Sequence, residues 1–166
     1  EIYDAADYHL TQGVAEAIFE VNGSGIPAIV VTNQPGIAKG LMTFETHEAI
    51  RARLDSQLAS EGAFVDDYFY CPHHPDSGFE GEVTALKIEC ECRKPGVGMA
   101  LAAALRHGID LQRSYVIGDT ARDLGLAKAL NANFVHVTRR CELQGEHMCF
   151  ADTNNAIRHA RMELTC

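Results

Sequence analysis

Two short clusters of metal-binding side chains constrain how this chain can fold. Cys71 and His73 form a C-x-H pair, and Cys90 and Cys92 form a C-x-C pair further along the chain. Three thiols and one imidazole suit the closed tetrahedral coordination of structural zinc, which leaves no position for a substrate. His74 competes as the fourth ligand, but His73 is preferred because its spacing mirrors that of the C-x-C pair, and His74 is then expected to be exposed or behind the ligands. The alternative is that the cysteines simply pack in the interior of the fold. We prefer the metal site, so the clusters predict a zinc ion that holds the loop between them.

Two cations follow the second cluster directly. Arg93 and Lys94 lie between Cys92 and Pro95, so a metal-fixed loop would hold them in place, whereas the simpler alternative is a pair of ordinary surface residues. A lysine offers a compact charge to a phosphoryl group, and an arginine offers a planar fork to a second anionic group. This segment therefore predicts a binding site for an anion, and phosphate is the ligand that we expect.

Composition narrows the class of protein. With 166 residues, 46% of them hydrophobic and 22% charged, the chain suits one globular domain with a real core. The net charge of −9 argues against a nucleic-acid partner. No membrane span or signal peptide is visible, so we expect a cytoplasmic monomer without a membrane partner. In that reducing setting Cys141, Cys149 and Cys166, which lack a pairing pattern, are predicted to be free thiols.

Apolar runs alternate with segments of helical periodicity along the chain. A short β-branched run such as IPAIVVT is typical of a buried parallel strand. Strands are expected at 26–32, 67–71, 115–118 and 134–138, and helices at 11–22, 43–61, 98–107, 122–130 and 154–163, with an irregular loop over 75–89. This order predicts a three-layer, Rossmann-like α/β fold with a mainly parallel sheet, in which ligands bind beyond the carboxyl ends of the strands.

Polar side chains follow two of these predicted strands. Thr32, Asn33 and Gln34 offer a hydroxyl and two amides, which are neutral partners for phosphate oxygens, although a simple turn also favours such residues. Asp119 is well placed to hold Mg²⁺, although it also suits a helix N-cap. Asp123 lies one helical turn further on and could pair with a lysine from another loop. The sequence therefore predicts a phosphate and magnesium site at the strand ends.

The segments VVTNQPGIAKG, YCPHHP, CECRKPGVGM and VIGDTARD together resemble the haloacid dehalogenase superfamily of phosphatases. The resemblance covers roughly residues 13–138 and is closest to the zinc-containing D-glycero-D-manno-heptose 1,7-bisphosphate phosphatase family, with histidinol phosphatases as near relatives. It implies a Mg²⁺-dependent hydrolase that forms an aspartyl-phosphate and removes the 7-phosphate of the heptose bisphosphate.

The resemblance also implies roles for individual residues. Thr32 and Lys94 would stabilise the phosphoryl group, Asp123 would orient Lys94, and Asp119 would bind Mg²⁺. The residues implied to contact substrate are Thr32, Asn33, Gln34, Pro35, Arg93 and Lys94. The substrate would be a small phosphorylated sugar, or histidinol phosphate if the chain is closer to that relative.

One departure from the superfamily pattern is decisive. Its first motif, D-x-D-G-T/V after an apolar strand, supplies the nucleophile and the acid/base, and the sequence does not contain it. Asp4 and Asp7 do not replace it, because no apolar strand precedes them. We therefore expect an N-terminally truncated, nearly inactive chain whose sheet lacks its first strand and exposes apolar edges. Two other readings are a degenerate relative that binds sugar phosphate without hydrolysis and a small zinc-stapled interaction module.

Overall fold

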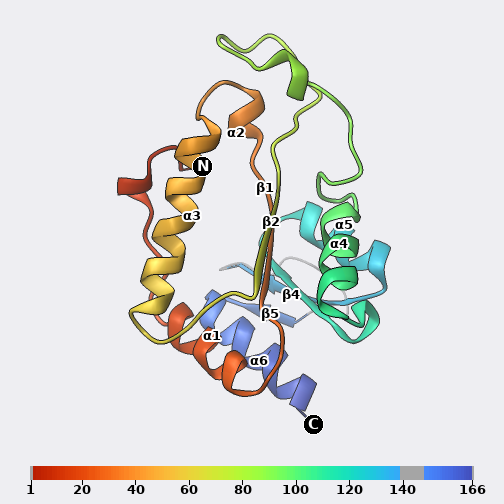
Figure 1. The fold of residues 1–166 in the computed structure, drawn as a ribbon. Helices are drawn as coiled ribbons and strands as arrows, with labels where there is room; N and C mark the ends of the chain where they lie inside the picture. The colour runs from red at the N-terminus through yellow and green to blue at the C-terminus, as the bar shows by residue number, and fades with distance from the viewer. Residues whose placement is uncertain (1, 139–147, 166) are drawn as a thin grey trace.

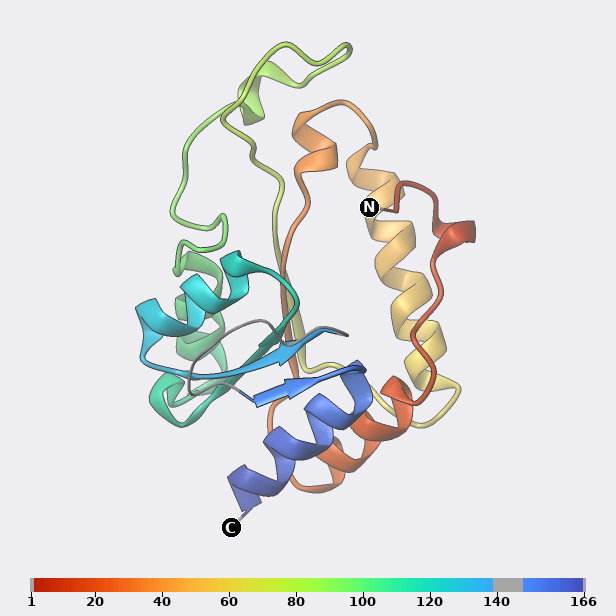
Figure 2. The same cartoon turned by 180° about the vertical axis from the view of Figure 1, so that it is seen from behind.

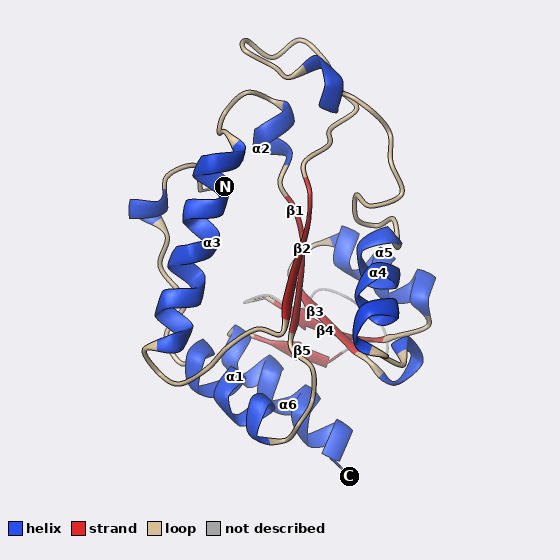
Figure 3. Cartoon of the chain, viewed as in Figure 1, coloured by secondary structure: helices blue, strands red, loops and turns tan. Residues whose placement is uncertain are grey.

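The computed structural model describes residues 2–138 and 148–165, which contain five parallel strands in two sheets. In the first sheet, β1 (Ile29–Asn33) pairs with β2 (Asp67–Cys71) along its whole length. In the second sheet, β4 (Asn133–Val137) lies between β3 (Tyr115–Gly118) and β5 (Met148–Phe150). Figures 1 and 3 show the two sheets meeting at the centre of the molecule.

Helices cover both faces of these sheets. On one side, α4 (Gly98–His107) packs on β1 and β2, and α5 (Ala121–Leu130) packs on β3 and β4. On the other side, α6 (Thr153–Thr165) packs against α1 (Val14–Gly23) and against the second sheet (Figures 1 and 2). The expected three-layer α/β architecture is therefore confirmed. Among the described residues, no helix combines the length and the apolar character that crossing a bilayer requires.

The longest helix of the described residues, α3 (Phe44–Ala59), completes the layer that contains α1. It begins where Thr43 accepts a hydrogen bond from the main-chain nitrogen of Thr46 at 3.1 Å, as a helix N-cap does. Its inner face buries Leu54 and Leu58 against Ala15 of α1, and this contact forms a small apolar core. Local capping and helical periodicity thus place α3 where the sequence predicts it.

Most expected elements are present, with shifted ends. The first helix begins at Val14 rather than at residue 11, because Gly13 before it adopts a left-handed backbone with φ of 79°. Sequence analysis missed the short helix α2 (Pro35–Ala38) and strand β5. It also missed three 3₁₀ turns, which are η1 (Ala5–Asp7), η2 (Thr84–Leu86) and η3 (Leu111–Arg113). These short elements depend on contacts with distant parts of the chain more than on periodicity.

The separation into two sheets leaves two strands with a free side. Among the described strands, β1 pairs only with β2, and β3 pairs with β4 but not with β1. Both β1 and β3 line one cavity of about 1150 Å³. The expectation of unpaired apolar sheet edges agrees with this arrangement.

Candidate functional site

Three sulfur atoms and one imidazole nitrogen converge beside the end of β2. The ligand atoms of Cys71, His73, Cys90 and Cys92 all lie within 4.8 Å of one another. The Cys92 Sγ atom lies 3.1 Å from the Sγ atoms of Cys71 and Cys90, and the His73 Nδ1 atom lies 3.4 Å from it. A disulfide would need about 2.05 Å, so these cysteines are thiols. Zinc–sulfur bonds of about 2.3 Å separate tetrahedral sulfur ligands by about 3.8 Å, so a small outward shift admits zinc.

The surroundings of this cluster suit a bound cation. Cys71 is fully buried, and burial raises the pKa of its thiol, so a thiolate there needs a positive neighbour. His74 is not part of the cluster, but it is buried, and its ring meets Phe79 edge-on. Of the two expected positions for His74, exposed or behind the ligands, the structure excludes the first. The loop between the clusters folds back over this residue, and the main-chain nitrogen of His74 donates to the Leu86 carbonyl at 3.2 Å.

Cys149, the remaining cysteine of the described residues, does not join this cluster. Cys149 on β5 is disulfide-bonded, so the prediction that it is a free thiol is wrong. Disulfide pairing depends on which cysteines the fold brings together, and spacing along the sequence does not reveal it. Cys141 and Cys166 lie outside the described residues.

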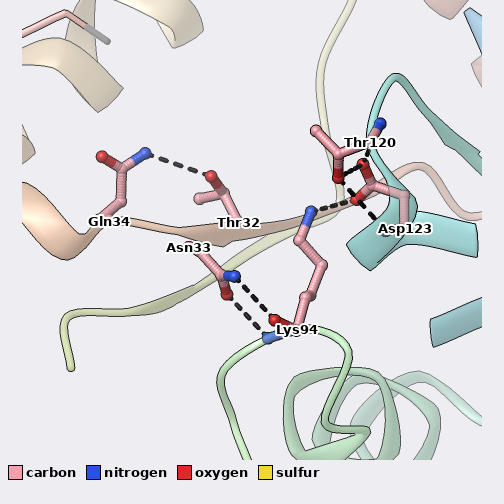
Figure 4. Close-up of polar contacts among 6 residues, drawn as sticks. All are labelled: Thr32, Asn33, Gln34, Lys94, Thr120 and Asp123. Carbon is pink, nitrogen blue, oxygen red and sulfur yellow. Dashed lines mark hydrogen bonds and ion pairs between the residues drawn. The ribbon is translucent and has the colours of Figure 1, made fainter. Parts of the chain in front are cut away.

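A lysine from the metal-clustered loop meets an aspartate from α5. The Lys94 Nζ atom donates to the Asp123 Oδ1 atom at 2.7 Å, as Figure 4 shows. The two side chains are only 16% and 7% exposed, so water screens this ion pair weakly. The other carboxylate oxygen accepts hydrogen bonds from the Thr120 hydroxyl at 2.6 Å and from the Thr120 main-chain nitrogen at 3.1 Å. Asp123 therefore has little freedom to rotate away from Lys94.

Opposing effects set the charge state of Asp123. Burial by itself would raise the pKa of this carboxyl group, because it disfavours the charged form. The hydrogen bonds from Lys94 and Thr120, together with the Lys94 charge, outweigh burial and lower the pKa below its usual value. Asp123 is therefore a carboxylate at neutral pH, and it holds the Lys94 side chain beside it.

An asparagine at the end of β1 clips the Lys94 loop to the sheet. The Asn33 side chain donates from Nδ2 to the Lys94 carbonyl at 3.1 Å and accepts from the Lys94 main-chain nitrogen at 2.8 Å (Figure 4). The next residue, Gln34, donates from Nε2 to the Thr32 hydroxyl at 3.2 Å, and its main-chain nitrogen donates to the Cys71 carbonyl at 2.8 Å. The strand end, the metal cluster and the lysine are thus joined by short hydrogen bonds.

The structure brings six of the eight residues expected at the phosphate and magnesium site around the cavity between the sheets. The expected site residues that line it are Thr32, Asn33, Gln34, Pro35, Lys94 and Asp123. Arg93 does not line this cavity, and its Nη1 atom donates to the His73 carbonyl at 3.2 Å. Asp119 is exposed beyond the end of β3, also outside the lining. The cavity therefore gathers a cation, a hydroxyl and two amides at the carboxyl ends of β1 and β3.

Two residues that support Asp123, which are Thr120 and Gly118, escaped the sequence analysis. Thr120 and Asp123 form a capping box at the start of α5, and the T-x-x-D spacing is the signal that could have revealed it. Gly118 precedes this turn, and a Cβ atom there would overlap the Asp123 side chain. A glycine at this position thus lets α5 begin close enough for its carboxylate to reach Lys94.

Parallel strands between helices, with a loop lysine held by an aspartate near a strand-end threonine, define a haloacid dehalogenase-like hydrolase. The family model described as HAD-hyrolase-like matches residues 91–148. D-glycero-beta-D-manno-heptose-1,7-bisphosphate 7-phosphatase from Rhodopseudomonas palustris is 40% identical over 117 residues, which is 70% of this chain and 63% of that protein. The enzyme of the same name from Yersinia pestis is 37% identical over 130 residues, 78% of this chain and 67% of that protein. The chain therefore belongs to the heptose-bisphosphate phosphatase family.

Solved structures agree with this assignment. The D,D-heptose 1,7-bisphosphate phosphatase from B. bronchiseptica, complexed with magnesium and phosphate, superposes with a TM-score of 0.80 and 27% identity, covering 99% of this chain and 89% of that one. A putative HAD-like phosphatase from Mesorhizobium loti gives a TM-score of 0.82 and 30% identity, covering 97% of this chain and 76% of that one. The matched region nevertheless spans less than two thirds of the Rhodopseudomonas protein.

Proposed function

We propose that this chain carries the phosphate-binding part of a Mg²⁺-dependent phosphomonoester hydrolase that removes the 7-phosphate of D-glycero-D-manno-heptose 1,7-bisphosphate. The relatives that match it carry the name of that activity. The observation that carries the proposal is the Lys94–Asp123 pair, which lines the same cavity as Thr32. A fixed ammonium group and a hydroxyl group suit the charge that gathers on a transferring phosphoryl group.

Each site residue has a task in this proposal. Lys94 and Thr32 contact the phosphoryl oxygens, and Asp123 holds the Lys94 side chain so that it is aimed at them. The amides of Asn33 and Gln34 stand beside Thr32 and, with the adjoining Pro35, contact the rest of the substrate. Arg93 lies outside the cavity lining. In this proposal it binds an anionic group of the substrate that extends beyond the cavity. We treat the 166 residues as one domain that acts in this way.

Two metal ions belong to the proposal. Zinc fits the cluster of three thiols and one imidazole and holds the loop that carries Lys94. Mg²⁺ commonly binds through one or two carboxylates together with water and substrate phosphate, and the exposed Asp119 at the end of β3 offers one such carboxylate. When bound, Mg²⁺ supplies positive charge to the phosphoryl group.

The described site contains no free carboxylate next to Lys94 that could attack phosphorus. Asp123 is occupied by Lys94 and Thr120, and the sequence has no D-x-D-G motif. An aspartyl-phosphate step would therefore need a carboxylate other than those of the described site. We expect the chain by itself to bind phosphomonoesters and to hydrolyse them hardly at all.

Calorimetric titration of the Zn²⁺- and Mg²⁺-loaded chain tests the proposal. Heptose 1,7-bisphosphate should bind more tightly than histidinol phosphate, and Lys94→Met should weaken binding about tenfold or more, since it removes a charge-assisted contact. Lys128→Met is the matched control, because Lys128 is exposed on α5 away from the cavity. Tighter binding of histidinol phosphate would assign the chain to that substrate instead.

Two further results would change the proposal in different ways. Equal binding by the Lys94 and Lys128 variants would favour the zinc-stapled interaction module, in which the cations have no ligand. The absent D-x-D-G motif favours a second candidate, a relative that binds sugar phosphate without hydrolysis. Rapid release of phosphate by the chain alone would contradict that candidate and our expectation of inactivity together.

A further inference from the structure

A histidine of α3 is buried behind the tyrosines of β2. His47 is only 1% exposed, and it does not line the cavity. Its ring contacts that of Tyr70, with centroids 4.1 Å apart, and its Nε2 atom lies 3.4 Å from the Tyr68 hydroxyl oxygen. Burying a polar group is costly unless it has a hydrogen-bond partner, so packing alone does not account for a histidine at this position.

Strand register gathers hydroxyl and amide groups on the face of the first sheet that His47 contacts. Thr32 is the register partner of Tyr70, which lies two residues beyond Tyr68. Side chains two residues apart along a strand lie on the same face of the sheet, as do those of paired residues in neighbouring strands. Gln34 follows Thr32 by two residues, and the Tyr68, Thr32 and Gln34 side chains line the cavity together.

Gln34 links the tyrosine to the threonine. Its Nε2 atom donates to the Thr32 hydroxyl oxygen at 3.2 Å, as Figure 4 shows. Burial raises the pKa of Tyr68 to about 12, and the Gln34 side chain acts against burial, as a donor to the phenol oxygen does. An amide NH₂ group carries two donor hydrogens, so the single Gln34 amide serves both hydroxyl oxygens.

The groups around His47 determine which of its ring nitrogens carries the proton. The Nδ1 atom makes no hydrogen bond within the described part of the chain, and the Glu48 Oε1 atom lies 3.8 Å from it. A proton on Nδ1 is attracted to that carboxylate, whereas a lone pair would be repelled. Burial lowers the pKa of His47, so the ring is neutral at neutral pH. The Nε2 atom is therefore an acceptor for the Tyr68 hydroxyl group.

These hydrogen bonds run in one direction. The Tyr68 hydroxyl donates to His47, so its oxygen accepts from Gln34. The Thr32 oxygen also accepts from Gln34, which leaves the Thr32 O–H free to donate to another group. Without the His47 acceptor, the Tyr68 proton would turn to the Gln34 amide oxygen. The amide would then face Thr32 with an acceptor, and it would draw the Thr32 proton into the protein.

We propose that His47 is a positioning residue of the phosphate site. Through Tyr68 and Gln34, it fixes the direction in which the Thr32 hydroxyl group donates, toward a bound ligand. His47 lies outside the cavity lining, so it acts only through these neighbours. The inference rests on the proposed function, because that function supplies the phosphoryl oxygen to which Thr32 donates.

Calorimetric titration of the Zn²⁺- and Mg²⁺-loaded chain with inorganic phosphate tests this inference. His47→Phe keeps a ring against Tyr70 but removes the acceptor, and it should weaken phosphate binding about fivefold, the size of one neutral hydrogen bond. Tyr68→Phe should have the same effect, and it carries the test if the His47 variant does not fold. His47→Gln restores an acceptor and should recover most of the affinity. Tyr70→Phe is the matched control, since it removes a hydroxyl group on the same face and should leave binding unchanged.

A double-mutant cycle separates positioning from packing. Thr32→Val removes the hydroxyl group that the hydrogen bonds orient, so His47→Phe should cause no further loss of phosphate affinity in that background. A loss of the same size in both backgrounds would show that His47 acts through packing, and it would overturn the inference. Native affinity in Tyr68→Phe would overturn it as well.

The same titrations separate this inference from the proposed function. Weaker binding in Lys94→Met and Thr32→Val, with native affinity in His47→Phe, would refute only the positioning role. Native affinity in all three variants would mean that phosphate does not bind at this cavity, and both ideas would fail. Weaker binding in all three, with coupling between His47 and Thr32, would support both.

Discussion

Replacing Cys92 by serine should release the metal and loosen the fold, because Cys92 is the most central ligand of the cluster. Its Sγ atom lies 3.1 Å from two other sulfur atoms and 3.4 Å from the His73 nitrogen, whereas Cys71 and Cys90 are 3.5 Å apart. A hydroxyl group is a poor zinc ligand, so Cys92→Ser leaves three ligands and an unbalanced site. The prediction is therefore loss of zinc rather than a small change of affinity.

The size of the expected change in melting temperature follows from the thermodynamic linkage between zinc binding and folding. A metal present at about 100 times its dissociation constant stabilises the folded state by about 2.7 kcal/mol. In a domain of this size each kcal/mol changes the melting temperature by about 2–4 °C. Cys92→Ser should therefore lower the melting temperature by roughly 5–10 °C in the presence of zinc, and chelation should lower that of the unmodified chain by a similar amount.

Elemental analysis of the purified chain and differential scanning calorimetry measure the two quantities. His74→Ala is the matched control, because His74 neighbours a ligand but lies outside the cluster, so that variant should keep one zinc per chain. Full zinc content in Cys92→Ser, or zinc loss in His74→Ala but not in His73→Ala, would show that the ligand set is wrong. A melting temperature that chelation leaves unchanged would show that the metal does not support the fold.

Three further predictions concern the lysine and its supports. Asp123→Ala should lower the free energy of unfolding in urea by about 3 kcal/mol, because it leaves Lys94 buried without its partner. The control is Asp119→Asn at an exposed position, which should change this free energy by less than about 0.5 kcal/mol. Equal effects of the two substitutions would refute the burial argument. Asn33→Ala should lower the free energy of unfolding by about 1–3 kcal/mol in the same assay, since it removes both hydrogen bonds to the Lys94 main chain. An unchanged free energy of unfolding would mean that these two hydrogen bonds do not form in solution. Folding lowers the pKa of Asp123, so this carboxylate stabilises the folded state at pH values above its usual pKa near 3.8, and the stabilisation is lost as pH falls through the lower pKa of the folded state. The free energy of unfolding of the native chain should therefore fall more steeply below pH ~4 than that of Asp123→Asn. Parallel acid unfolding curves would contradict this prediction.

The sequence was informative where the chemistry is local. The C-x-H and C-x-C spacings and the strand-end aspartates led to the metal cluster and to the Lys94–Asp123 pair, because each ligand type lies in a short recognisable motif. Contacts between distant segments were not predictable in the same way. The double hydrogen bond from Asn33 to the Lys94 main chain and the burial of His74 depend on how loops fold back on the sheet. Periodicity carries no information about such contacts.

Gly40 has a consequence for how sequences of this kind can diverge. It follows α2 with a left-handed backbone, and a Cβ atom there would overlap the carbonyl oxygen of Gly81 in the loop between the metal-binding pairs. Beside this contact, the Val83 main-chain nitrogen donates to the Ala38 carbonyl at 3.0 Å. Any side chain at position 40 would lift the loop, so drift is restricted at two places that are far apart in the chain. At Gly78 in the same loop a Cβ atom would meet no neighbour, so only the left-handed backbone, with φ of 100°, disfavours a side chain there.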